Sequence, residues 1–104
     1  MSWMPLRRKG RPGTLRRADS ADTEHLVEFA RSRTGVEAYL EPRTTVTDTT
    51  VVLVAASGEW TRRRVEGARA AQSFAKKHAI PLYEVERVGY PRRMREWTER
   101  NRRP

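Results

Sequence analysis

The spacing of hydrophobic residues changes several times along the chain, and each change predicts a different element. Hydrophobic side chains recur every three or four positions in two stretches, which predicts helices over residues 21–33 and about 67–79. Between these stretches, Val36 to Leu40 alternate with polar residues and predict a half-buried strand. Residues 50–56 are apolar on both faces and therefore predict a central strand.

The segment after the central strand has a mixed pattern. The Ser-Gly pair at 57–58 predicts a tight hairpin loop, and residues 59–65 predict an antiparallel return strand. Neither face of this strand is cleanly apolar, because arginines occupy the three successive positions 62–64. The pattern predicts an edge strand, in which one bulge turns both Trp60 and Val65 inward.

The last part of the sequence predicts a strand over residues 82–88 and a short final helix beginning at Pro91. The order α-β-β-β-α-β predicts an α+β fold: one small domain with a mixed four-stranded sheet and helices on one face. Proline and glycine interrupt any helix near the N-terminus, so we expect a disordered arm there. The expected parts are a disordered basic arm over 1–18, an α+β domain over 19–91, and a basic C-terminal helix or tail over 92–104.

Charge is concentrated at the two ends of the sequence. The 104 residues include 22 Lys+Arg against 13 Asp+Glu, for a net charge of +9. Residues 1–17 contain six bases and no acid, and residues 92–104 contain six bases and two acids. Basic ends of this kind bind polyanions, because each neutralised phosphate releases counterions. Two alternatives stay open: the charge only aids solubility, or a genome rich in G+C raises the arginine content.

The residues predicted to bind nucleic acid combine cationic and aromatic side chains, which suit phosphate contact and base stacking. They are Arg7, Arg8, Lys9, Arg11, Arg16, Arg17, Trp60, Arg62, Arg63, Arg64, Tyr90, Arg92, Arg93 and Arg95. We expect a non-catalytic protein that contacts RNA or the ribosome without reading base sequence. Both a monomer and a homodimer are compatible with the sequence.

Two other hypotheses come from different classes of protein. The first is a protein-interaction adaptor that binds a protein partner through Trp60 and Trp97, although both tryptophans also suit an internal packing role. The second is a small enzyme, which would need a deep pocket around His25, Glu84 or Glu86. The sequence has no cysteine, nucleophile motif or glycine-rich phosphate loop, so we expect no catalytic residue, metal or cofactor.

The hydrophobic segments are short throughout the sequence. No apolar run approaches the roughly 18–20 residues that a membrane span needs, and no signal-peptide hydrophobic region is present. We therefore expect a soluble cytoplasmic protein with no membrane partner.

Five short motifs, read in order, give the chain a resemblance to a known group of proteins. They are VVLV at 51–54, GEWTRR at 58–63, FAKK at 74–77, IPLY at 80–83 and GYPRRMR at 89–95. Over residues 20–97 the chain resembles small basic actinobacterial proteins of unknown function, some of which carry an automatic oxidoreductase label. The resemblance implies no agreed catalytic residue or cofactor, and no dinucleotide fingerprint or redox cysteine supports that label.

Overall fold

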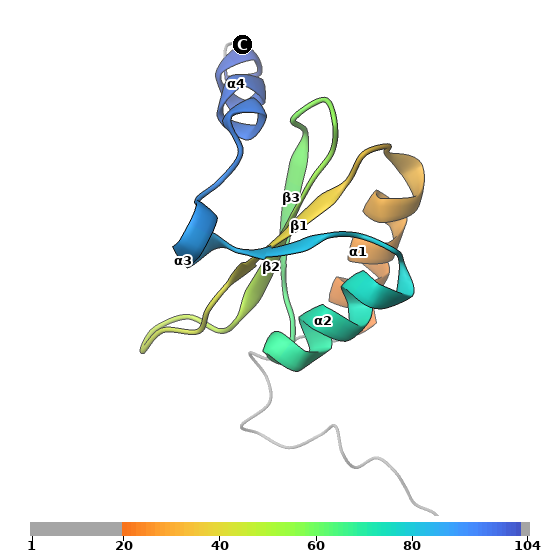
Figure 1. The fold of residues 1–104 in the computed structure, drawn as a ribbon, viewed down its shortest axis with the longest axis vertical. Coiled ribbons are helices and arrows are strands. Elements are labelled where there is room, and N and C mark those ends of the chain that lie inside the picture. Colours follow the sequence, from red (N-terminus) through yellow and green to blue (C-terminus); the bar gives the residue numbers. More distant parts are fainter. Residues whose placement is uncertain (1–19, 103–104) are drawn as a thin grey trace, which may run out of the picture.

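A four-stranded mixed sheet forms the centre of the fold (Figure 1). The computed structural model describes residues 20–102, so the arm predicted over 1–18 lies outside the described residues. The elements are α1 (Ser20–Ser32), β1 (Glu37–Glu41), β2 (Thr50–Val54), β3 (Trp60–Arg64), α2 (Ala68–Lys77), β4 (Leu82–Glu84), α3 (Val85–Val88) and α4 (Arg92–Arg100). The strands lie in the order β3-β2-β1-β4; β4 is parallel to β1 and the other pairs are antiparallel. This arrangement confirms the predicted α+β class.

Helices α1 and α2 cover one face of the sheet, and the main core lies beneath them (Figure 1). Its buried side chains are Leu26, Phe29, Ala38, Leu40, Val51, Leu53, Ala55 and Ala71. Burial of these side chains follows the hydrophobic periodicity, because the apolar stripe of each helix faces the sheet. The periodicity placed both helices within two residues of their actual ends.

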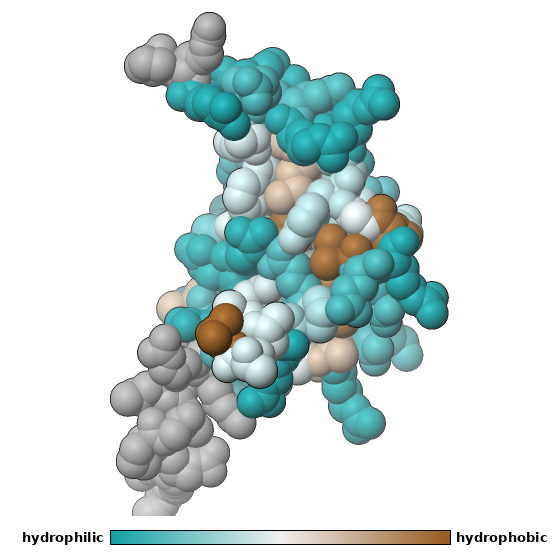
Figure 2. Space-filling view, turned by 90° about the vertical axis from the view of Figure 1, so that its left-hand side faces the viewer, coloured by the Kyte–Doolittle hydropathy of each residue, from teal (hydrophilic) through white to brown (hydrophobic). Residues whose placement is uncertain are grey.

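The opposite face of the sheet is covered by the C-terminal part of the chain. Met94 of α4 packs on Tyr39, Val52 and Val54, and half-buried Trp60 adjoins this second core. The exposed side of α4 is hydrophilic and lies near the top of Figure 2. Strand β2 is therefore buried on both faces, as predicted. The prediction of a half-buried β1 is wrong, because Tyr39 is only 5% exposed beneath this cover.

Strand β3 lies at one edge of the sheet, as its arginines predict, but it has no bulge. Its pairing with β2 is continuous from Arg64 to Trp60. Val65 packs against the main core and Trp60 against the second core, on opposite sides of the sheet. The predicted bulge is wrong because each face of the sheet carries a core. Trp60 and Val65 lie on opposite faces of a regular strand, and each therefore points into a core without a bulge.

Strand β4, at the other edge, is shorter than predicted. It pairs with β1 only as far as Glu84, opposite Leu40. β1 ends at the following residue, before Pro42, and proline has no N–H to continue the pairing. The chain then forms the single helical turn α3, so Glu86 lies on a helix and not beside Glu84 on a strand face.

Candidate nucleic-acid interface

Two of the predicted phosphate-binding arginines are bound to glutamates on the second face of the sheet. Arg62 of β3 donates to both carboxylate oxygens of Glu41, at 2.8 and 2.9 Å. Arg93 of α4 donates to Oε1 of Glu37 at 2.8 Å. A guanidinium in this geometry makes strong, charge-assisted hydrogen bonds. These two arginines are therefore committed to contacts inside the protein.

The same two carboxylates also bind tyrosines. Tyr90 donates its hydroxyl hydrogen to Glu41, and Tyr39 donates to Glu37 at 2.8 Å. The hydrogen bond from Arg93 lowers the pKa of Glu37. Burial opposes ionisation of Glu41, but the donors around it, Arg62 foremost, outweigh burial and lower its pKa. Burial, with the adjoining Glu37, raises the pKa of Tyr39 to about 12, and burial also raises the pKa of Tyr90. Both glutamates are therefore charged and both tyrosines are neutral at pH 7.

Helix α4 is held on the β2–β3 hairpin by further contacts. Arg93 Nε donates to the carbonyl oxygen of Ala55 at 2.9 Å, and Trp60 Nε1 donates to Thr98 Oγ1 at 2.8 Å. Gly58 has a φ of +97°, and a Cβ there would overlap the Arg93 carbonyl oxygen and lie 2.9 Å from the Trp97 Cβ. The two tryptophans of the adaptor hypothesis thus both take part in contacts within the protein.

The other described arginines of the predicted set differ in their surroundings. Arg63 lies 3.6 Å from an Asp22 carboxylate oxygen. Arg92 and Arg95 are exposed on α4. Glu96 follows Arg92 by four positions and Glu99 follows Arg95 by four, so each acid lies on the same side of the helix as its arginine. Within residues 20–102, Arg64 forms no ion pair. Arg7, Arg8, Lys9, Arg11, Arg16 and Arg17 lie outside the described residues.

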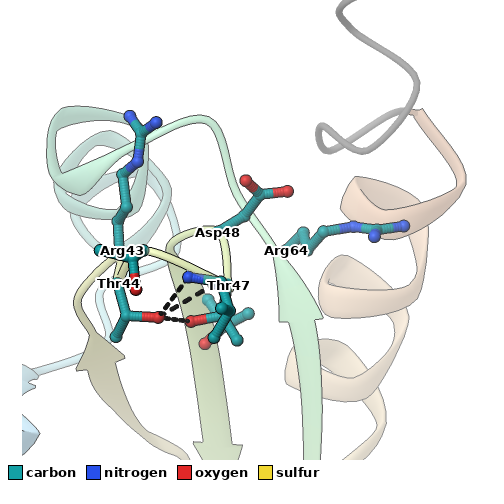
Figure 3. A pocket seen from close by; sticks show the side chains of 8 residues that line it. Arg43, Thr44, Thr47, Asp48 and Arg64 are labelled. Carbon is teal, nitrogen blue, oxygen red and sulfur yellow. Dashed lines mark hydrogen bonds between the residues drawn. The ribbon is translucent and has the colours of Figure 1, made fainter.

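Arg64 lines a hollow of about 390 Å³ at the β1–β2 loop together with Arg43 (Figure 3). The loop is held by Thr44, whose Oγ1 accepts hydrogen bonds from the backbone N–H groups of Val46 and Thr47. In Figure 3 the two guanidinium groups lie on either side of Asp48. Neither arginine forms an ion pair within residues 20–102, although the acid Asp48 lines the same hollow.

Helix α2 also carries positive charge on its exposed side. Arg69, Lys76 and Lys77 are exposed, and α2 contains no acidic residue. Ser20, the first described residue, lines one hollow with Glu66 and Ala70. We call the surface of Arg43 and Arg64, at the β1–β2 loop, the basic end.

Sequence reasoning missed Arg43 and the cations of α2. The signal for α2 was available: Arg69 and Lys76 are seven positions apart and lie on one helix face, and no acid interrupts them. Arg43 is a single basic residue in a threonine-rich loop and carried no such signal. Its position beside Arg64 follows only from the fold.

The residues named for an enzyme form no common site. His25 Nε2 lies 2.6 Å from Thr61 Oγ1, whereas Glu84 is exposed beside Arg87. Residues 20–102 contain no group of three His, Cys, Asp or Glu side chains that can hold a metal ion. In the same part of the chain, no helix has the length and hydrophobicity needed to cross a bilayer.

Comparison of the chain with protein-family models, with curated proteins and with solved structures gives no match. A function is therefore inferred from the sequence and from the charge, burial and geometry of the described residues.

Proposed function

We propose that this chain is a non-catalytic nucleic-acid-associated binding protein that contacts RNA, most directly in the ribosome, and acts in the cytoplasm. Residues 1–17 supply six bases without an acid. Together with the two arginines, Arg43 and Arg64, that line one hollow of the domain, this charge pattern is the observation that carries the proposal. A run of uncompensated cations releases counterions when it neutralises phosphates, which gives affinity without base specificity.

The contacts of the arginines decide which of them can bind phosphate. Arg62 and Arg93 hold glutamates of β1, and moving either guanidinium to a phosphate would leave a carboxylate unpaired on the second sheet face. Arg43, Arg64 and Arg69 have no such partner within residues 20–102. The phosphate contacts therefore come from the arm and the basic end, and α4 contributes less because its outer face also carries Glu96 and Glu99.

The test is a salt titration of binding to an RNA hairpin and to a DNA duplex. If about six phosphates are neutralised on a duplex, the logarithm of the affinity should fall with the logarithm of the salt concentration at a slope near −5. A variant with all six arm bases changed to glutamine should lose most of this slope.

The matched control changes Arg92 and Arg95 to glutamine on α4, where acids share the same helix face. This variant should keep most of the slope. A salt response that is flat in the unmodified protein removes the proposal.

A further inference from the structure

Large hydrophobic side chains that are exposed gather at one place in the described part of the chain. Tyr83, Val88 and Tyr90 are 37%, 58% and 38% exposed and line a single hollow between β1, β4 and the segment that leads into α4. Val46, on the β1–β2 loop, is the other exposed large hydrophobic residue within 20–102. Figure 2 shows hydrophobic atoms on this side of the molecule at the level of α3, below the hydrophilic α4. Such a patch with a hollow in it is typical of a binding site.

The hollow has rigid aromatic walls and room for one small group. Its volume is about 190 Å³, which is below the range of about 300–1,000 Å³ found for drug-sized ligands. The ring of Tyr83 stacks on that of buried Tyr39, with centroids 5.4 Å apart and an interplanar angle of 30°. Tyr90 is fixed by its hydrogen bond to Glu41, and Pro91 follows it in the wall. The rings are therefore held in place before any ligand arrives.

One polar group with a free acceptor also lines the hollow. Oε1 of Glu37 accepts hydrogen bonds from both Tyr39 and Arg93, but no hydrogen bond among residues 20–102 uses Oε2. An ionised carboxylate can only accept, so a ligand that satisfies Oε2 must carry a donor. The hollow thus suits a planar ring with an N–H donor at its edge.

We infer that this hollow binds one unpaired nucleobase that bears an exocyclic amine, from a single-stranded stretch of RNA. The base stacks on Tyr83 and its amine donates to Glu37. This inference rests on the proposed function, because the arm and the basic end supply most of the affinity for the RNA.

A nucleobase fits these observations better than an apolar side chain of a protein partner. An apolar side chain would cover the rings but would leave Oε2 of Glu37 without a donor and partly desolvated, which is unfavourable. Stacking on an aromatic ring also tolerates different bases, so the amine is the feature that distinguishes them.

The experiment measures binding of the full chain to short single-stranded oligo(C) and oligo(U), because cytosine carries an exocyclic amine and uracil does not. We expect tighter binding of oligo(C). Tyr83→Ala should weaken oligo(C) binding by about tenfold, the effect of losing one stacked base, with the salt slope unchanged. Tyr83→Phe keeps the ring and should retain the affinity, as should Val46→Ala, which removes the exposed hydrophobic side chain outside the hollow.

The role of the carboxylate is tested by a matched pair of ion-paired glutamates. Glu37→Met and Glu59→Met each remove one ion pair with an arginine, but only Glu37 lines the hollow. Glu37→Met should abolish the preference for oligo(C), and Glu59→Met should leave it in place. In the unmodified protein, addition of oligo(C) should shift the backbone NMR signals of Val88 and Gly89, a measurement that does not depend on the folding of any variant.

Three results would overturn this inference alone: equal affinity for oligo(C) and oligo(U), no loss of affinity in Tyr83→Ala, or no NMR shift around the hollow. In each case a steep salt dependence of RNA binding would leave the proposed function standing. Absence of binding to any RNA at low salt would overturn both.

Discussion

Arg62 and Arg64 lie two positions apart on the same face of β3, yet their surroundings differ. Arg62 is bound to Glu41 through two hydrogen bonds and lies over the ring of Trp60, 5.3 Å from its centroid. Arg64 is opposite Thr50 and lines the hollow that contains Arg43. The same residue type therefore closes the second core in one place and forms no ion pair within residues 20–102 in the other.

The difference extends to the two regions that contain these residues. On the second sheet face, Glu37 and Glu41 each bind one arginine, and the pairs fix α4 and the Tyr90 turn against the sheet. At the basic end, Arg43 and Arg64 form no ion pair among residues 20–102, although Asp48 lines the same hollow. We expect an arginine to bind an external anion where the fold forms no ion pair with it.

The largest expected effect comes from adding one methyl group to a glycine in each region. Gly58→Ala should lower the free energy of unfolding by about 3 kcal/mol, because its Cβ overlaps the Arg93 carbonyl oxygen and its φ of +97° disfavours alanine. Gly67→Ala, between β3 and α2, meets no atom within 4 Å and should change stability by at most about 1 kcal/mol. Urea unfolding followed by tryptophan fluorescence measures both; equal losses would show that α4 is not tightly docked.

A smaller effect is expected when an arginine is removed from each region. Arg93→Met should cost about 2 kcal/mol, because it removes the hydrogen bonds to Glu37 and to the Ala55 carbonyl oxygen. Arg64→Met should change stability by less than about 0.5 kcal/mol, as for most surface substitutions. Thermal unfolding of the two variants gives the comparison, and a loss at Arg64 as large as that at Arg93 would contradict it.

The paired region should also be sensitive to acid. The pKa values of Glu37 and Glu41 are lower in the folded protein than in the unfolded chain. The two carboxylates therefore stabilise the fold fully above their unfolded pKa, and this stabilisation is lost as the pH falls through their folded pKa. Between about pH 6 and pH 3 we expect a loss of about 1 kcal/mol for each carboxylate, since both are partly exposed to solvent.

The control for this pH effect is the double variant Glu37→Gln/Glu41→Gln, whose unfolding should depend less on pH over the same range. If its stability falls with pH as steeply as that of the unmodified protein, other carboxylates are responsible.

Local patterns in the sequence were enough to predict the helix-covered half of the fold. The periodicity around Leu26 and Phe29 and the apolar run of β2 each specify their own element and its buried face. The mixed patterns of β1 and β3 did not reveal the second core, because its cover includes Met94, far away in sequence. No local rule indicates that a distant helix will return to bury Tyr39.

The partners of the predicted site residues were also set by the fold and not by the local sequence. Arg62 and Arg93 reach glutamates 21 and 56 positions away, through strand register in one case and the docking of α4 in the other. The hollow around Tyr83 was also hidden, because it needed β4 to pair with β1 and then end at Glu84. Charge density along the sequence identified residues 1–17 as basic but could not show which of the described arginines have a partner.

The most direct test compares the salt dependence of RNA binding in Arg64→Met and Arg62→Met, after unfolding experiments show that each variant is folded. Arg64→Met should reduce the steepness of the logarithmic salt slope by about 0.7–0.9, the effect of one lost phosphate contact, and Arg62→Met should leave the slope unchanged. Equal reductions in the two variants would contradict the assignment of Arg62 to the protein's own structure and of Arg64 to the nucleic acid.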